Sequence, residues 1–257
     1  MTAETKDTDT PHLCTQEPCL SVVSPMYNEA GGAAALVREI DTALDSINHE
    51  IIIVNDGSDD DTVKMLEGLR SQIPSLRIIS HEKNAGQSRA LRTGVIAARA
   101  PIIAMLDGDG QNNPIDIVAL YEKLNAGSCD SIGLVAGERT ERQDSKAKKI
   151  ASSAANGIRK RLLNDDANDT GCGLKVFSRD AFLKLPYFDH MHRYLPALMR
   201  REGYGVTFLP VSHRPRLHGQ SKYNNLGRLL VAIRDLLGVI WLLARSRSPG
   251  RITESGE

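Results

Sequence analysis

Ile102-Ile-Ala-Met-Leu-Asp-Gly-Asp-Gly-Gln111 is the stretch that decides the fold, because an apolar run passes directly into an acidic turn. The apolar part, Ile102–Leu106, is typical of a strand that is buried on both faces. Similar short runs occur earlier at Leu20–Ser24, Glu50–Val54 and Arg77–Ser80. Helical spacing of apolar residues separates these runs. Strands that alternate with helices predict an α/β fold with a doubly wound, mostly parallel, Rossmann-like sheet.

The remaining elements follow from the same patterns. Helices are expected within 36–47, 63–69 and 91–98, and from Asn113-Pro114 onward, where proline suits the first turn. Later elements are expected as strands at Ser131–Ala136, Leu174–Ser178 and Gly205–Ser212, a basic helix from about 145 to 163, and an amphipathic helix from Asn225 to Arg245. The chain therefore divides into a disordered tail at 1–18, one domain at 19–224, and a membrane-interface or packing helix with its tail at 225–257.

Polar clusters follow three of the predicted strands, at the point where each strand ends. They are Pro25–Glu29, Asn55–Asp59 and Asp107–Gln111. In an open parallel sheet, ligands bind beyond the carboxyl ends of the strands, which all lie at one edge. We therefore expect the three clusters to form one binding site.

Asp107 and Asp109 lie one residue apart in the third cluster. Two carboxylates in this arrangement can share Mg²⁺ or Mn²⁺, and the cation can also hold a diphosphate. Gly108 and Gly110 let the backbone turn and approach a ligand. A solvated acidic turn is the alternative, but the position after a buried strand favours a metal site that stabilises a leaving nucleoside diphosphate.

The first two clusters have the residue types of a nucleoside site. Asp56 follows its strand closely enough to hydrogen-bond a base or ribose, although it is also a common turn residue. Asp60 or Asp61 is expected to cap the next helix. Tyr27 and Glu29 suit the holding of a nucleoside, and an ordinary loop is the alternative reading.

Three segments together resemble family 2 glycosyltransferases of the GT-A fold over about residues 19–225. They are Ser24-Pro-Met-Tyr-Asn-Glu-Ala30, Val54-Asn-Asp-Gly-Ser-Asp59 and Leu106-Asp-Gly-Asp-Gly-Gln111. Further motifs are similar to the polyprenyl-phosphate branch, of the dolichyl-phosphate mannosyltransferase and bactoprenol glucosyltransferase type. These are Asp169-Thr-Gly-Cys-Gly173, His192-Arg-Tyr-Leu-Pro196 and Arg216-Leu-His-Gly-Gln-Ser-Lys-Tyr223.

The resemblance implies a role for each matching residue. The donor nucleoside would be held by Pro25, Tyr27, Glu29 and Asp56. The metal and diphosphate would be held by Asp107, Asp109 and Gln111. The acceptor phosphate would be received by Arg139, Lys149 and Ser152. The diphosphate would be covered by a loop that carries Arg216 and Lys222.

The expected reaction is an inverting, single displacement from a nucleotide sugar to a polyprenyl phosphate, as in cell-envelope glycan synthesis. A phosphate monoester has its second pKa near ~6, so it needs no strong general base. An alcohol acceptor does need one, and Asp169 is the candidate for that base or for an orienting carboxylate. The alternatives are transfer to a saccharide hydroxyl and a nucleotide-sugar-binding protein without turnover. The donor is GDP- or UDP-linked, and the sugar is left open.

Composition limits the partners and the location. The chain has 257 residues with 32 Lys and Arg against 32 Asp and Glu, which argues against a general nucleic-acid binder. Four cysteines without metal-ligand spacing indicate free thiols in a reducing cytosol. The apolar segment Leu229–Ala244 is shorter than a membrane span and contains Arg234 and Asp235. We expect it to lie in the membrane interface, which makes the protein cytoplasmic and peripheral at the inner face, or to pack on the core or on a second copy.

Overall fold

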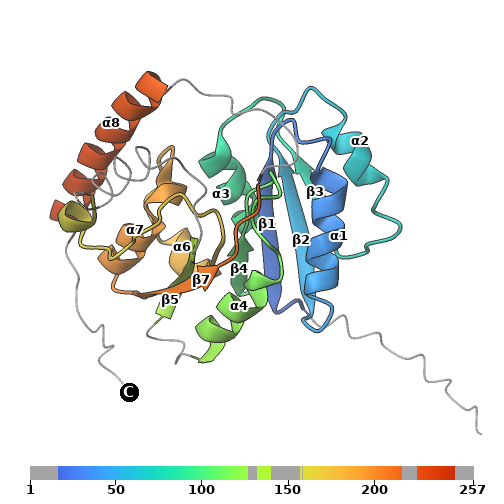
Figure 1. The fold of residues 1–257 in the computed structure, drawn as a ribbon, viewed down its shortest axis with the longest axis horizontal. Coiled ribbons are helices and arrows are strands. Elements are labelled where there is room, and N and C mark those ends of the chain that lie inside the picture. The colour runs from blue at the N-terminus through green and yellow to red at the C-terminus, as the bar shows by residue number, and fades with distance from the viewer. Residues whose placement is uncertain (1–16, 127–131, 140–156, 158, 216–224, 247–257) are drawn as a thin grey trace, which may run out of the picture.

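The computed structural model describes residues 17–126, 132–139, 157, 159–215 and 225–246. Seven described strands form one sheet in the order β3-β2-β1-β4-β6-β5-β7. Their bounds are β1 Leu20–Met26, β2 His49–Asn55, β3 Leu76–Ser80, β4 Ile102–Met105, β5 Ile132–Arg139, β6 Lys175–Ser178 and β7 Gly205–Val211. The strands expected from the apolar runs are confirmed, and the fold is the expected α/β GT-A fold (Figure 1).

One strand runs against the others. The pairings β1 with β2, β1 with β4, β2 with β3 and β5 with β7 are parallel. β6 lies between β4 and β5 and is antiparallel to both. The carboxyl ends of β4, β5 and β7 therefore meet the amino end of β6 at one edge of the sheet.

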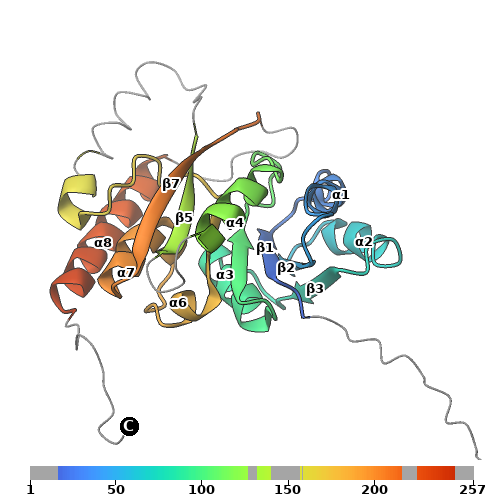
Figure 2. The same ribbon diagram turned by 90° about the horizontal axis from the view of Figure 1, so that it is seen from below.

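The described helices cover both faces of this sheet (Figure 2). Their bounds are α1 Ala33–Ala43, α2 Thr62–Glu67, α3 Gln87–Ala97, α4 Asp116–Ala126, α6 Arg179–Leu183, α7 Leu195–Arg201 and α8 Asn225–Ala244, with a 3-10 turn at Met191–Arg193. Of the basic helix expected from about 145 to 163, residues 159–163 are helical, and most of the remainder lies outside the described residues.

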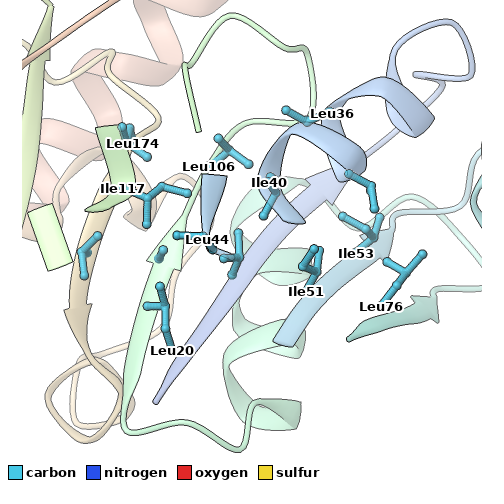
Figure 3. Close-up of a cluster of buried hydrophobic side chains, with 14 of the residues drawn as sticks. Leu20, Leu36, Ile40, Leu44, Ile51, Ile53, Leu76, Leu106, Ile117 and Leu174 are labelled. Carbon is cyan, nitrogen blue, oxygen red and sulfur yellow. The ribbon is translucent and has the colours of Figure 1, made fainter. Parts of the chain in front are cut away.

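Alternation along the central strands separates two hydrophobic layers. Val22 of β1 and Ile51 of β2 pack with α1, α2 and α4, in the cluster drawn in Figure 3. Their neighbours Val23 and Ile52 point to the other face and pack with α3, α6, α7 and α8. Because side chains in a strand alternate between faces, an unbroken apolar run fills both layers at once.

The helix α8 packs on the second layer through one side only. Val239 is fully buried there, and His190 Nδ1 lies 2.9 Å from Asp235 Oδ2. The opposite side leaves Leu237 and Trp241 exposed at 62% and 59%. The helix therefore packs on the core and also presents apolar side chains to solvent, and its contact with a membrane or with a second copy stays a prediction. None of the described helices is long and apolar enough to cross a bilayer.

Candidate active site

The polar clusters after β1 and β2 contact each other directly. The side-chain oxygen of Asn28 accepts a hydrogen bond from the backbone amide of Asp59 at 3.0 Å. The backbone amide of Asn28 donates to Ser58 Oγ at 2.9 Å. The Glu29 amide donates to Thr62 Oγ1 at 2.9 Å. The third cluster joins them, because a Cβ on Gly108 would lie 2.8 Å from the Pro25 carbonyl oxygen. The expectation that all three share one edge of the sheet is confirmed.

Asp56 is almost completely buried and holds the segment that leads into α3. Its carboxylate accepts hydrogen bonds from His81 Nδ1 at 2.7 Å, the Ala85 amide at 3.0 Å and the Gly86 amide at 2.8 Å. The side chain therefore fixes the wall of the expected nucleoside site. Its direct contact with a nucleoside stays a prediction, as do those of Pro25, Tyr27 and Glu29. Tyr27 is 36% exposed.

The cap of α2 divides between two neighbouring residues. Asp61 occupies the N-cap position but makes no capping bond with its side chain. Asp60 Oδ1 accepts from the Thr62 amide at 3.0 Å, and its Oδ2 accepts from the Ala30 amide at 3.1 Å. Asp60 therefore links the start of α2 to the loop after β1.

The acidic pair lies beyond β4, where the sheet meets α3. The side chain of Gln87, at the start of α3, donates to Asp107 Oδ1 at 2.6 Å. The backbone amide of Gln111 donates to Asp109 Oδ1 at 3.1 Å. Burial raises the pKa of Asp107, and the nearby charge of Asp109 raises it further. Oxygen ligands on two adjacent carboxylates fit Mg²⁺ or Mn²⁺, which commonly bind one or two carboxylates together with substrate phosphates. Among the described residues, no group of three His, Cys, Asp or Glu side chains forms a ready metal site.

Asp107 should limit the stability of the metal-free protein. Its pKa is raised, so the ionised carboxylate destabilises the fold above that pKa, and protonation removes the penalty as the pH falls. We expect Asp107→Asn to raise the free energy of unfolding by about 0.5–2 kcal/mol at neutral pH in chelator. The gain should shrink as the pH is lowered. Urea unfolding at several pH values measures this, and a less stable variant at neutral pH would contradict it.

The loop Asp169–Gly173 fits closely against the acidic pair. A Cβ on Gly173 would lie 2.1 Å from Asp107 Oδ2, so only glycine allows this contact. Two residues earlier, a Cβ on Gly171 would lie 2.9 Å from Arg139 Nη2. One loop therefore contacts both the expected metal ligand and the expected acceptor-binding arginine.

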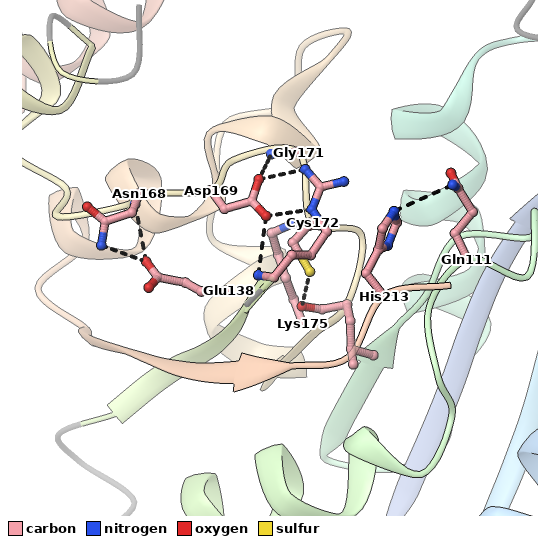
Figure 4. Close-up of polar contacts among 10 residues, drawn as sticks. Gln111, Glu138, Asn168, Asp169, Gly171, Cys172, Lys175 and His213 are labelled. Atoms are coloured by element: carbon pink, nitrogen blue, oxygen red, sulfur yellow. Dashed lines mark hydrogen bonds and ion pairs between the residues drawn. The ribbon is translucent and has the colours of Figure 1, made fainter. Parts of the chain in front are cut away.

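Arg139 and Asp169 form a bidentate ion pair (Figure 4). Arg139 donates from Nε to Asp169 Oδ2 at 2.6 Å and from Nη2 to Oδ1 at 2.7 Å, while its amide lies 3.3 Å from Oδ2. This geometry fixes the guanidinium at the end of β5. It supports Asp169 as an orienting carboxylate, and the role of general base stays a prediction. Lys149, Ser152, Arg216 and Lys222 lie outside the described residues.

Gln111 lies against the segment that follows β7. The side-chain Nε2 of Gln111 is 3.5 Å from His213 Nε2. The backbone carbonyl of Gln111 accepts a hydrogen bond from the backbone amide of Arg214 at 2.9 Å. Arg214 in turn donates to Glu39 Oε2 and Asn113 Oδ1, both at 2.7 Å. Arg214 also lines an open groove of about 390 Å³ whose walls do not include the acidic pair. The role of Gln111 as a metal ligand stays a prediction. Its observed contacts connect the acidic turn to the segment that follows β7.

Sequence reasoning did not assign Gln87 or Lys175. Lys175 is buried at the start of β6 and donates to the Cys172 carbonyl. Burial lowers its pKa, which the charges of Asp107 and Asp169 oppose. Lys175 could have been identified from the sequence, because it is a charged residue at the first position of a buried strand. Nothing in the local pattern distinguishes Gln87 from any polar residue at a helix start.

An α/β sheet of this order, with an acidic pair beyond β4, defines the GT-A class of glycosyltransferases. The chain belongs to glycosyl transferase family 2, whose sequence model matches residues 21–185.

Curated relatives support the family assignment. The chain is 33% identical over 237 residues to a dodecaprenyl-phosphate galacturonate synthase of Rhizobium johnstonii, covering 90% of this chain and 69% of the relative. It is 32% identical over 221 residues to an undecaprenyl-phosphate 4-deoxy-4-formamido-L-arabinose transferase of Klebsiella pneumoniae, covering 85% of this chain and 66% of the relative. The chain thus spans slightly less than two thirds of the second relative's length.

A solved structure shows the same fold. Glucosyl-3-phosphoglycerate synthase of Mycobacterium tuberculosis, crystallised with Mn²⁺, uridine diphosphate and glucosyl-3-phosphoglycerate, superimposes with a TM-score of 0.67. It is 18% identical, and the match covers 91% of this chain and 82% of that one. At this identity the likeness concerns the fold alone.

Proposed function

We propose that the protein transfers a sugar from a GDP- or UDP-linked donor to a polyprenyl phosphate, with Mg²⁺ or Mn²⁺ as cofactor. The observation that carries this proposal is the loop Asp169–Gly173, which contacts Asp107 on one side and Arg139 on the other. A carboxylate pair suited to a cation and an arginine suited to a phosphate therefore lie together. The acceptors named for the two curated relatives are also polyprenyl phosphates.

In this reaction an oxygen of the acceptor phosphate attacks the anomeric carbon of the donor sugar. The bond from that carbon to the diphosphate breaks on the opposite face, so the configuration inverts and the nucleoside diphosphate leaves. Arg139, oriented by Asp169, binds the acceptor phosphate through its outer guanidinium edge. Asp107 and Asp109 would hold a divalent cation, which would supply neutralisation of the charge on the leaving group.

The pairing of Asp169 favours a phosphate acceptor over a sugar hydroxyl. A hydroxyl acceptor needs a base that is ready to take its proton. Both oxygens of Asp169 are engaged by Arg139, and the carboxylate side chain is only 8% exposed. A phosphate acceptor is already ionised at neutral pH, so it can use the arginine without requiring the carboxylate to change partners.

The decisive experiment incubates the protein with Mn²⁺, a short polyprenyl phosphate and a panel of GDP- and UDP-sugars. We expect nucleoside diphosphate release that depends on the lipid phosphate. The matched control is the corresponding polyprenyl alcohol, which has the same chain without the phosphate. Release that requires a saccharide and ignores the lipid phosphate would reject the proposed acceptor.

Membrane contact is proposed to come from the outer side of α8. Ile233, Leu237 and Trp241 follow each other at intervals of four residues and are 48%, 62% and 59% exposed. Residues at this spacing share one face of a helix. Arg245 lies beside Trp241, with its guanidinium carbon 5.8 Å from the ring centroid. An exposed apolar face flanked by arginine fits an in-plane helix at an anionic, cytoplasmic membrane surface.

We expect the double variant Leu237→Ser/Trp241→Ser to bind anionic liposomes at least about tenfold more weakly, because each buried side chain contributes roughly 1.5–3 kcal/mol. Cosedimentation with the liposomes measures the effect. Met65→Ser on α2, where the side chain is 46% exposed, is the control and should bind as the unmodified protein does. Unchanged sedimentation of the double variant would rule out this face, and an altered mass in solution would assign it to contact between two copies.

A further inference from the structure

Ser88 and His192 form a buried hydrogen-bonded pair that the proposed reaction does not yet use. Ser88 lies in the first turn of α3, and His192 lies in the 3-10 turn Met191–Arg193. Ser88 Oγ is 2.8 Å from His192 Nδ1 and 3.4 Å from the His192 amide nitrogen. Ser88 is fully buried and His192 is 7% exposed.

The two contacts are compatible with an arrangement of protons that leaves an N–H donor at Nε2. The His192 amide can only donate, so Ser88 Oγ accepts from it and is still able to donate its own hydrogen to Nδ1. Nδ1 is then the acceptor, and a neutral imidazole with an acceptor at Nδ1 carries its proton on Nε2. Burial keeps the ring neutral by lowering the pKa of His192 well below its ordinary value, and the charges of Arg193 and Lys175 act in the same direction.

The Nε2 atom has no hydrogen-bond partner among the described residues. It is also absent from the buried side-chain atoms that lack a partner, which are Ser24 Oγ, His49 Nε2, Arg92 Nη1 and His213 Nδ1. Among the described residues, Nε2 is thus not a completely buried atom without a partner, although His192 as a whole is only 7% exposed. With the proton on Nε2, this atom would be an N–H donor that no group in the described part of the chain accepts.

The start of α3 connects this donor to the rest of the site. Three consecutive residues each contact a different functional segment: Gly86 donates to Asp56, Gln87 donates to Asp107, and Ser88 bonds His192. The distances are 2.8, 2.6 and 2.8 Å respectively. His192 and Asp107 are therefore both contacted by residues of the first turn of α3.

We propose that His192 Nε2–H is a substrate-contacting donor that binds a phosphate oxygen, and that Ser88 is the positioning residue that sets its tautomer. The nearby Lys175 and Arg193 favour an anionic ligand over a neutral one. The oxygen belongs either to the donor diphosphate or to the acceptor phosphate. This inference rests on the proposed function, because it uses the phosphates of that reaction.

Two amide variants separate this role from simple packing. In His192→Gln the amide nitrogen can take the place of Nε2, whereas in His192→Asn the side chain reaches only the position of Nδ1 and can keep the bond to Ser88. We expect His192→Asn to weaken binding of one phosphate ligand by about ten- to a hundredfold. His192→Gln should remain within a few-fold of the unmodified protein.

The probes are UDP and GDP with Mn²⁺ for the donor site and farnesyl phosphate for the acceptor site, each titrated separately by calorimetry. The ligand that is lost in His192→Asn identifies the source of the oxygen. The opposite order, with His192→Gln weaker, would show that only the bond to Ser88 matters and would overturn the proposal. Equal effects, or no effect, in the two variants would overturn it as well.

A second measurement does not depend on any ligand. The ¹⁵N shifts of His192 in the unliganded protein should report a neutral ring protonated at Nε2, and Ser88→Ala should allow the other tautomer. A ring protonated at Nδ1 in the unmodified protein would overturn the inference. If the unmodified protein binds none of the three probes while the tautomer is as expected, the proposed function fails and the assigned geometry of His192 stands.

Discussion

Asp109→Asn is expected to lower sugar transfer by about a hundred- to a thousandfold or more while the fold survives. The substitution keeps the size of the side chain and the Oδ1 atom that accepts from the backbone amide of Gln111. It removes one of the two negative charges that can hold a divalent cation. Loss of one stabilising contact to the leaving group typically costs this much in rate. The effect should fall on the chemical step and on metal-dependent donor binding together.

Two measurements test the result. Calorimetric titration of the nucleoside diphosphate with and without Mn²⁺ should show that the variant has lost the metal-dependent part of the affinity. Thermal unfolding should remain near that of the unmodified protein. Asp45→Asn is the control, because Asp45 is an exposed carboxylate beyond α1 and should behave normally in both assays. Transfer within tenfold of the unmodified rate would exclude Asp109 as a metal ligand.

Gly173→Ala should be nearly as damaging, for a steric reason. The added Cβ would lie 2.1 Å from Asp107 Oδ2 and 2.2 Å from its carboxyl carbon, so the carboxylate must leave its place beside Gln87. We expect transfer to fall by about a hundredfold or more. Overpacking of this kind should also cost about 1–3 kcal/mol of stability.

Gly171→Ala and Gly238→Ala provide the matched comparisons. At Gly171 the new Cβ meets the guanidinium of Arg139, so the acceptor phosphate should be affected more than the donor. At Gly238, in α8, no atom outside the adjacent backbone of the helix lies within 4 Å of the new Cβ, so the change should be neutral or slightly stabilising. The steady-state constants for donor and acceptor distinguish the three variants. Normal metal-dependent donor binding in Gly173→Ala would show that Asp107 does not need its observed position.

The first half of the fold could be predicted from sequence because its signals are local. Continuous apolar runs give strands buried on both faces, and the polar residues that end them necessarily lie at one edge. Thus Asp107, Asp56 and Glu29 were placed correctly relative to the sheet. Strand bounds shifted by a few residues, as in β5, which continues to Arg139 instead of ending at Ala136.

The second half depends on contacts that no local pattern encodes. The reversed direction of β6 could not be predicted, because a short apolar run reads the same in either orientation. The pairing of Arg139 with Asp169 spans 30 residues, so only the fold brings the two side chains together. The same holds for Ser88 and His192, which are 104 residues apart.

The reversal of β6 has a consequence for how acceptor choice can change. Because β6 runs opposite to its neighbours, the connection from the end of β5 at Arg139 returns to the sheet on the same edge, at Lys175. This connection both starts and finishes beside the acidic pair, while the first four strands and their helices lie elsewhere in the sequence. On the proposed function, substitutions at the two described ends of this connection would therefore alter groups beside the acceptor phosphate while leaving the first four strands unchanged.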